Sequence, residues 1–442
     1  MLKKIMSPIF ITGILLISVT FLLGSCKKKE GPQGPAGTNG TNGTNGLDAN
    51  ETCKLCHNPS TVDSVSTMFE LSKHYYGSVA FEEAGNTTCA PCHEQEGFKY
   101  VCKNNTPATF VLSGTSYVNN YVSSSSTAYG NLSCFTCHSS LHTTYGYSDF
   151  SPLTTIAAVS MTMWGGAKTI NITQDGGISN LCVKCHQPRP LTTATDKNVL
   201  NYASLVSNPT GIIYDTTATT NLIKPSYRTG IHYGSVGAIF AGIGGVEFSG
   251  PESYSNQSHT TVATCQSCHM APMTGKAGGH TFSVIGNFNG CNVTECHGPG
   301  TVSTSSSVYW TNPRADIKGK LDALAAKLKQ GTIEILNRYG DATNNLWYGL
   351  TTNNYDGNLN IYDPVNNPDG PIYNVHQFKN PSTSGFTPAQ ITINNTLPQL
   401  QLTNAQMGAI INFQLCLREF SLGIHNYSYS YALLANSIAV LP

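Results

Sequence analysis

Hydrophobic residues recur at helical spacing only in the last third of the chain. After Val302, four aliphatic residues follow one another at intervals of four, three and four: Ile317, Leu321, Leu324 and Leu328. This spacing places them on one face of a helix, which we expect to continue past Gly331 towards Ile335 and Leu336.

Two further helices are predicted near the carboxyl end. One begins at Thr403 or Asn404, both suitable N-caps, and runs through Phe420. The other is marked by four residues of one face: Tyr427, Tyr431, Leu434 and Ile438. A stretch rich in Asn, Asp, Gly and Pro, 341–384, reads as a loop. We therefore expect residues 301–442 to form a C-terminal helical region.

Residues 50–300 lack long periodic runs and are dense in Gly, Ser, Thr and Asn. Alone, this pattern would indicate a poor hydrophobic core. Charged residues make up only 11% of the chain, well below the roughly 25% of ordinary soluble proteins. The 24 basic and 24 acidic residues balance, which gives no support for a nucleic-acid partner.

The amino terminus has the form of a targeting segment. Lys3 and Lys4 precede an apolar run, 9–23, that is too short for a comfortable transmembrane helix. The run ends in Leu23-Gly24-Ser25-Cys26, which resembles the lipobox of bacterial lipoproteins, whose cysteine is lipidated. We predict a lipoprotein signal peptide over 1–26, with Cys26 as the lipidation site; the alternative is an ordinary cleaved signal peptide with a chance cysteine.

Residues 27–50 contain glycine at every third position from Gly31 to Gly46. Period-three glycine is typical of collagen, because only glycine fits the crowded axis of three strands. The tract is short, and few of its triplets contain proline, so we expect a collagen-like Gly-x-x spacer. Assembly of a homo-oligomer through this tract is the alternative.

The cysteines carry the chemistry. Of 15 cysteines, 12 occur in six pairs, each followed at once by histidine. Five pairs have the pattern Cys-x-x-Cys-His: Cys53-Cys56-His57, Cys89-Cys92-His93, Cys134-Cys137-His138, Cys182-Cys185-His186 and Cys265-Cys268-His269. A sixth is stretched by two residues: Cys291-Asn-Val-Thr-Glu-Cys296-His297.

Two thiols at this spacing can each form a thioether with a haem vinyl group, and the histidine that follows then binds the iron axially. Zinc sites also use Cys-x-x-Cys, but they do not require a histidine in register in every copy. We therefore predict about six covalently attached haem c groups. If the stretched pair is vestigial, five remain.

A count of histidines agrees with this prediction. The chain has 13, of which six lie in the motifs. The other seven exceed the number of irons by one, so a second imidazole is available for each: His74, His142, His232, His259, His280, His376 and His425. Two imidazoles per iron give a closed centre suited to electron transfer.

The chain resembles multihaem c-type cytochromes with bis-histidine ligation, including outer-membrane and extracellular electron-transfer lipoproteins. The resemblance lies in the haem motifs and in the segments Ile231-His232-Tyr233-Gly234, Ser258-His259-Thr260, Gly278-Gly279-His280 and Gly423-Ile424-His425-Asn426. It implies a mainly α fold with extensive irregular loops, in which a haem-packed multihaem cytochrome c domain (51–300) carries a C-terminal helical cap. The distal ligands that it favours are His74, His232, His259, His280 and His425, with His142 next. His376 is expected to be a surface residue.

Electron transfer is the predicted function, with redox partner proteins or extracellular acceptors at either end and no catalytic residues. The alternative is a multihaem reductase with one open iron, acting on a small oxyanion. A surface-adhesion lipoprotein would leave the haem motifs unexplained. The expected location is the outer membrane, on its periplasmic side or at the cell surface. Cys102 and Cys416 remain as two free thiols or, less favoured, a disulfide.

Overall fold

The computed structural model describes residues 49–77, 89–104, 110–113, 116–119, 131–191, 200–215, 228–338, 355–362, 373–374 and 385–442. The chain divides into two units, Met1–Glu51 and Thr52–Pro442. In the first, only residues 49–51 are described, and they begin a helix. The predicted signal peptide, Cys26, the Gly-x-x spacer and His376 lie outside the described residues.

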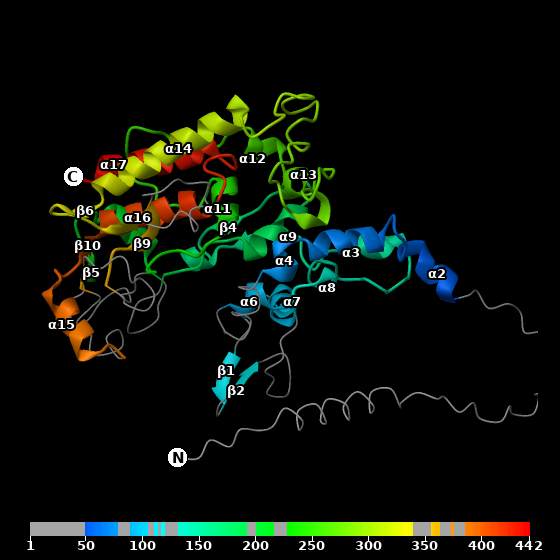
Figure 1. Ribbon diagram of the computed structural model, residues 1–442, viewed down its shortest axis with the longest axis horizontal. Coiled ribbons are helices and arrows are strands. Elements are labelled where there is room, and N and C mark those ends of the chain that lie inside the picture. Colours follow the sequence, from blue (N-terminus) through cyan, green and yellow to red (C-terminus); the bar gives the residue numbers. More distant parts are fainter. Residues whose placement is uncertain are drawn as a thin grey trace, which may run out of the picture. The chain divides into compact units, whose positions relative to one another are not determined.

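The half of the chain that carries the cysteine motifs folds into short helices joined by irregular loops (Figure 1). Its α-helices are α2 (Ala49–Cys56), α3 (Val62–Glu70), α4 (Lys73–Tyr76), α6 (Ala90–His93), α7 (Gln95–Asn104), α8 (Cys134–Cys137), α9 (Ile178–Cys185), α10 (Tyr202–Ser207), α11 (Val236–Ala241), α12 (His259–Val262) and α13 (Cys265–His269). Three 3₁₀ turns accompany them: Tyr147–Phe150, Thr162–Trp164 and Gly279–Thr281. The prediction of a helix-rich fold with extensive loops is confirmed.

Strands occur among the described residues only as antiparallel pairs, and none closes into a larger sheet. The pairs are β1 (Phe110–Ser113) with β2 (Ser116–Asn119), β3 (Val159–Ser160) with β4 (Thr169–Ile170), β5 (Ile212–Asp215) with β10 (Gln401–Thr403), β6 (Lys329–Gln330) with β7 (Ile333–Glu334), and β8 (Leu336–Arg338) with β9 (Tyr355–Leu359). The β5–β10 pair joins the motif-bearing half to the C-terminal region.

The C-terminal region contains the long helices α14 (Val308–Lys327), α16 (Asn404–Arg418) and α17 (Tyr427–Val440), together with the shorter α15 (Pro388–Thr396). On α14 the predicted face is buried, since Ile317, Leu321 and Leu324 are at most 2% exposed. Thr403 is the N-cap of α16, where its side chain accepts a hydrogen bond from the backbone N–H of Gln406. The three predicted helices are therefore confirmed.

Two expectations for this region are wrong. The first helix does not continue past Gly331, because α14 ends at Lys327 and the chain turns into the β6–β7 hairpin. Gly331 has a φ of +63°, a left-handed conformation that suits a tight turn and not a helix interior. Within the predicted loop 341–384, Tyr355–Leu359 forms β9, whose five residues are all buried.

Helix α16 lies in the core, with α14 and α17 beside it (Figure 1). Fourteen of its 15 residues are buried, and they include polar side chains. Asn412 binds both backbone groups of Val246, at 2.8 and 2.7 Å. Gln414 accepts from the N–H of Ile231 at 2.9 Å and donates to the carbonyl of Thr229 at 3.0 Å. These bonds satisfy buried backbone groups and tie two separate stretches to the helix, residues 229–231 through Gln414 and Val246 through Asn412.

Candidate functional site

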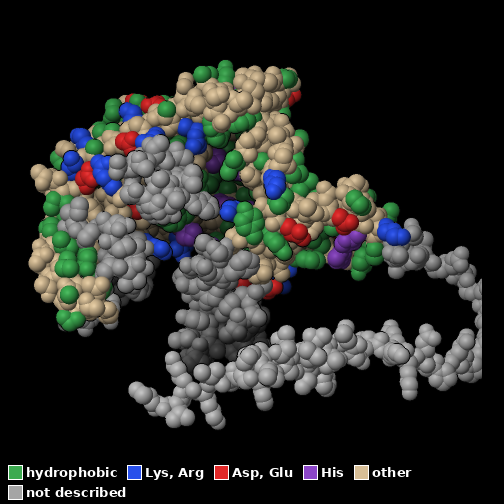
Figure 2. All heavy atoms as spheres, viewed as in Figure 1, with side chains coloured by type: hydrophobic (Ala, Val, Ile, Leu, Met, Phe, Trp, Pro, Cys, Tyr) green, Lys and Arg blue, Asp and Glu red, His purple; other side chains and the backbone are tan. Residues whose placement is uncertain are grey.

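A continuous cavity of about 3160 Å³ runs through the unit Thr52–Pro442. It is several times larger than the roughly 300–1,000 Å³ of a pocket for one small ligand. All 12 motif cysteines, all six motif histidines and all six predicted distal histidines line it. Histidine side chains are visible in a hollow on the face shown in Figure 2. The sequence-predicted residues are thus gathered around one space.

Each motif makes a tight turn that presents its cysteines and histidine together. In four motifs the backbone N–H of the histidine donates to the backbone carbonyl of the first cysteine over 2.8–3.0 Å. These histidines are His57, His93, His138 and His186. In the fifth, His269 belongs to α13. The Cys134 and Cys265 turns are preceded by capping boxes, at Ser133 and Thr264.

The stretched motif reaches the same arrangement by a bulge. The N–H of His297 donates to the carbonyl of Cys291 over 3.2 Å, although two more residues separate them than in the other motifs. An additional bond from the N–H of Cys296 to the carbonyl of Val293, 3.0 Å, closes the inserted turn. The insertion therefore leaves His297 in the usual relation to the first cysteine of its pair.

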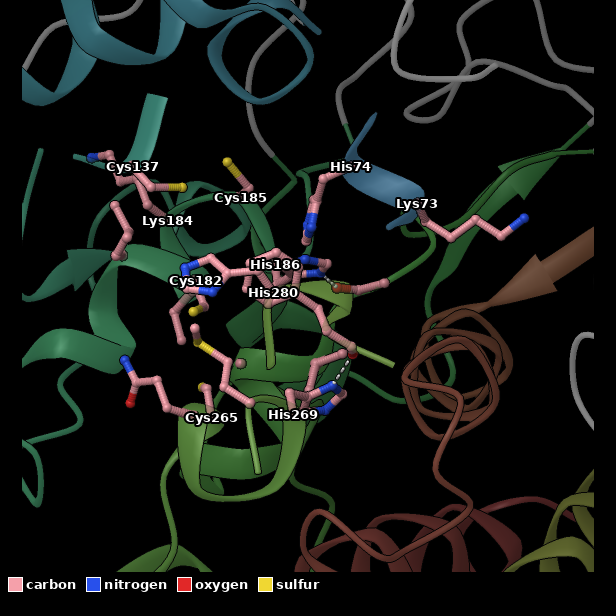
Figure 3. Close-up of a pocket in the computed structure, with 18 of the residues that line it drawn as sticks. Lys73, His74, Cys137, Cys182, Lys184, Cys185, His186, Cys265, His269 and His280 are labelled. Carbon is pink, nitrogen blue, oxygen red and sulfur yellow. Dashed lines mark hydrogen bonds between the residues drawn. The ribbon is translucent and has the colours of Figure 1, made fainter. Parts of the chain in front are cut away.

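Every motif histidine faces one histidine from elsewhere in the chain, with ring centres 5.9–6.5 Å apart. We number the sites by the order of their motifs. The pairs are His57–His142 at 5.9 Å (site 1), His93–His232 at 6.0 Å (site 2), His138–His280 at 6.5 Å (site 3), His186–His74 at 6.0 Å (site 4), His269–His425 at 6.2 Å (site 5) and His297–His259 at 6.0 Å (site 6). Figure 3 shows His74 pointing toward His186.

This separation suits a metal ion between two imidazoles. An imidazole nitrogen binds a transition metal at about 2 Å and lies roughly 1 Å from the centre of its own ring, so two opposed rings should be about 6 Å apart. Groups of three or more His, Cys, Asp or Glu that could hold a bare ion are absent from the described residues. The donors occur as pairs, which suits an iron whose other four ligands come from a macrocycle.

Hydrogen bonds to the second ring nitrogen orient several of these imidazoles. The Nδ1 atoms of His138, His186 and His269 lie 2.9, 3.1 and 2.8 Å from backbone carbonyls, the last of them the carbonyl of Phe282 (Figure 3).

Two distal histidines are held in the same way, since Nδ1 of His232 and of His259 lies 2.6 and 2.7 Å from a carbonyl oxygen. A carbonyl can only accept, so at His232 the proton is on Nδ1 and the lone pair of Nε2 is available to a metal. Nδ1 of His259 also lies 2.9 Å from the side-chain nitrogen of Gln257.

Burial favours the neutral form of three of the imidazoles in the cavity. It lowers the pKa of His74, His232 and His269 to about 4. Metal binding requires the neutral form, so at pH 7 these side chains are ready ligands.

Contacts between motifs join the sites to one another. The Cys92 sulfur of site 2 is 4.0 Å from the carbonyl of Lys184 in the site 4 motif. The backbone N–H of Cys265 in site 5 donates to the hydroxyl of Ser179, on the helix α9 that carries the site 4 motif, over 3.0 Å. Sites 2, 4 and 5 are therefore immediate neighbours.

Phe282 connects three sites. Its ring centre is 5.0 Å from that of His74 (site 4) and 5.7 Å from that of His280 (site 3), and its carbonyl binds His269 (site 5). At site 1, the ring of His142 lies 6.0 Å from Phe135 of the site 3 motif. At site 6, His259 binds the carbonyl of Ile424, the neighbour of His425. All six sites are linked by such contacts.

Basic side chains outnumber acidic ones around the cavity. The lining contains Lys73, Lys184, Arg189, Arg228, Arg314 and Arg418, against Asp149, Glu295 and Glu419. Arg418 is 2% exposed, and its Nε has no hydrogen-bond partner among the described residues. A buried donor of this kind suits an anionic ligand such as a haem propionate.

The two remaining described cysteines, Cys102 and Cys416, are both free thiols. Cys416 is buried in α16, where burial raises its pKa, and burial also raises the pKa of Cys102 to about 11. Both stay protonated at neutral pH and hence are weak nucleophiles. The structure agrees with the two-thiol interpretation.

Comparison with known proteins gives no assignment. No protein-family model, curated protein or solved structure matches this chain. In the part of the chain that the structure describes, no helix is long and apolar enough to cross a bilayer. The function must therefore be argued from the residues that line the cavity.

Proposed function

We propose that this protein is an electron-transfer protein that binds six haem c groups, each attached by two cysteines and held between two histidines. The thioether residues are Cys53, Cys56, Cys89, Cys92, Cys134, Cys137, Cys182, Cys185, Cys265, Cys268, Cys291 and Cys296. Bound haem would supply a one-electron iron couple at each site. The basic side chains around the cavity offer partners for the propionates.

One observation carries this proposal. All six motif histidines have an opposing imidazole at 5.9–6.5 Å, and no imidazole is shared between pairs. A reductase that acts on a small oxyanion needs one iron with an open position. Six complete pairs give no such position, which weighs against the reductase and in favour of a carrier.

The chain's own residues would do three things in this function. The motif turns fix each cofactor in place, and the Nδ1 hydrogen bonds set the tautomer and the orientation of the ligands. At sites 4 and 5, burial of the imidazoles would keep water away from the irons, which favours electron transfer over ligand exchange; at site 1, His57 and His142 are exposed. Contacts such as those of Phe282, and the hydrogen bond between Cys265 and Ser179, keep neighbouring sites close enough for electrons to pass between them.

The setting that we propose is outside the cytoplasm, with Cys26 lipidated and residues 27–50 as a spacer from the outer membrane. Redox partner proteins or extracellular acceptors would exchange electrons with the sites. Haem c would be attached in an oxidising compartment, where accessible thiols form disulfides. Cys102 and Cys416 stay free there only if they are protected, and Cys416 is fully buried.

The test is to produce the protein in a host that attaches c-type haem. We would count covalent haems by mass and by iron, and then record a spin-quantified EPR spectrum of the oxidised protein. Six haems with only low-spin iron are expected. A high-spin signal of about one haem would favour the reductase, and the absence of covalent haem would overturn the proposal.

A further inference from the structure

Site 5 differs from the other sites in what binds its distal histidine. Nδ1 of His425 lies 2.5 Å from a carboxylate oxygen of Glu419, whereas Nδ1 of five other histidines among the described residues contacts a backbone carbonyl. A carbonyl is a neutral acceptor, and a carboxylate brings a full negative charge. The ligand pair of site 5 is therefore in contact with a charge of the chain itself.

Burial and hydrogen bonds fix the Glu419 side chain in this position. It follows directly on α16, and its side chain is fully buried. Besides His425, it accepts hydrogen bonds from the Ser421 hydroxyl at 2.9 Å and from the N–H of Gly423 at 3.3 Å. All three partners donate, which suits a carboxylate. Such a group cannot move away from the imidazole without losing its partners.

Arg314, on the neighbouring helix α14, is a basic side chain close to Glu419. Its Nη1 donates to the carbonyl of Ser421 at 2.8 Å, and its charge interacts with Glu419. The carboxylate of Glu419 is the acceptor for the outer N–H of His425, and it is a stronger hydrogen-bond partner than the backbone carbonyl that binds the opposing His269.

We infer that Glu419 is a positioning residue that lowers the reduction potential of the haem held by His269 and His425. The inference rests on the proposed function of the sites. A carboxylate that binds the outer N–H of a metal-bound histidine makes the ligand a stronger electron donor, which favours the ferric over the ferrous state. The buried negative charge of Glu419 acts in the same direction, because it repels the electron that reduction adds to the iron.

Site 5 contacts both site 4 and site 6, so a lowered potential at site 5 affects electron transfer between those two sites. Cys265 donates its backbone N–H to Ser179 on α9, the helix of the site 4 motif, and the carbonyl of Ile424, next to His425, binds His259 of site 6. An electron that crosses from site 4 to site 6 by these contacts must pass a site that Glu419 makes harder to reduce. Glu419 would thus set the rate of transfer to site 6 without lying on an external surface.

The experiment compares the wild-type holoprotein with Glu419→Gln, which keeps an acceptor for His425 but removes the charge. Potentials are measured by titration with dithionite, followed by EPR of the individual low-spin signals. We expect the ferric/ferrous equilibrium of site 5 to shift at least tenfold towards the ferrous form. For a one-electron couple this shift raises the reduction potential by about 59 mV. Glu334→Gln is the control, because Glu334 does not line the cavity, and it should leave all six potentials in place.

A second variant separates charge from structure. Arg314→Gln removes the positive charge near Glu419 and should lower the site 5 potential, opposite to Glu419→Gln. If both variants move the potential in the same direction, or if Glu419→Gln does not move it, the inference is overturned. Haem counts and low-spin quantification of the same samples test the proposed function separately: six low-spin haems with unmoved potentials would sink only the role of Glu419.

Discussion

His74 and His186 face each other at 6.0 Å, although one lies on the four-residue helix α4 and the other directly follows α9. Ser72 caps α4 and is itself buried, so the helix is fixed at its start. The pairing supports His74 as the distal ligand that we propose for site 4, in the middle of the linked sites.

Replacing His74 by alanine should open one iron and leave five unchanged. We expect about one-sixth of the iron to become high-spin in the oxidised protein, because an iron without its sixth strong ligand changes spin state. Spin-quantified EPR measures this directly. His376→Ala is the matched control, since His376 is expected to be a surface residue and should leave all iron low-spin. A fully low-spin His74→Ala protein would contradict the assignment.

The angles between paired rings predict two classes of EPR signal. Three pairs are closer to parallel, at 18° (site 5), 31° (site 3) and 36° (site 1). Three are closer to perpendicular, at 65° (site 2), 77° (site 4) and 83° (site 6). Parallel imidazoles split the iron d orbitals that they overlap and give rhombic spectra, whereas crossed imidazoles leave them nearly equal and give one feature at large g.

The oxidised protein should therefore show both classes in about equal amounts. His74→Ala should remove intensity from the large-g class only, and Glu419→Gln should act on the rhombic class only. A spectrum with a single class would show that the ring orientations of the holoprotein differ from those described above.

The sequence was sufficient for the local part of this site. Cysteine spacing and the adjacent histidine depend on one turn of chain, so the motifs could be read directly, and the periodic face of α14 predicted a buried helix. The partner of each motif histidine could not be read, because residues such as His269, on α13, and His425, between α16 and α17, meet only in the folded chain. Glu419 gave no signal at all, since a carboxylate six residues before a histidine has no fixed relation to it outside a folded chain.

The two wrong predictions concern segments in which a turn or a strand pairing, and not the hydrophobic pattern, determines the secondary structure. Ile335 and Leu336 continue the apolar spacing of α14, yet they are buried by the strands that follow Gly331. Burial of apolar side chains can be achieved by either structure, and the left-handed glycine decides between them. Tyr355–Leu359 likewise reads as a loop by composition and becomes a strand by pairing with β8.

Asp149 should control the ligand of site 1. His142 and Tyr145 both have positive φ values, 62° and 58°, which are unfavourable outside glycine. The Asp149 carboxylate holds this turn, because it accepts from the N–H of Tyr145 at 3.0 Å and from the N–H and hydroxyl of Thr144. The hydrogen bonds, that of the Thr144 hydroxyl foremost, keep the pKa of Asp149 below its ordinary value, so the group is charged at neutral pH.

We expect Asp149→Ala to release His142 and to make the site 1 iron high-spin, with the signal lost from the rhombic class. Asp63→Ala, at an exposed carboxylate on α3, is the control and should leave the spectrum unchanged. If Asp149→Ala remains fully low-spin, the turn does not depend on this carboxylate.

Gln414 should couple the stability of the core to the ligand of site 2. Its side chain binds the backbone of Ile231 and Thr229, on the segment that carries His232, and also the carbonyl of Gly357 at 2.6 Å. Gly230 is fitted to it, since a Cβ there would lie 1.8 Å from the Gln414 amide oxygen. Gln414→Leu would leave several buried backbone groups without partners, and we expect a loss of about 3 kcal/mol in the free energy of unfolding.

Asn412→Leu is the matched control for this variant. Asn412 also makes buried hydrogen bonds from α16, but to Val246 and Ser437 and not to the segment of His232. Urea unfolding should show a similar loss of stability for both variants, because each leaves buried polar groups unpaired. Only Gln414→Leu should add a high-spin signal, taken from the large-g class of site 2. If the two variants give the same spectrum, Gln414 stabilises the core without positioning His232, and the link between α16 and this ligand is wrong.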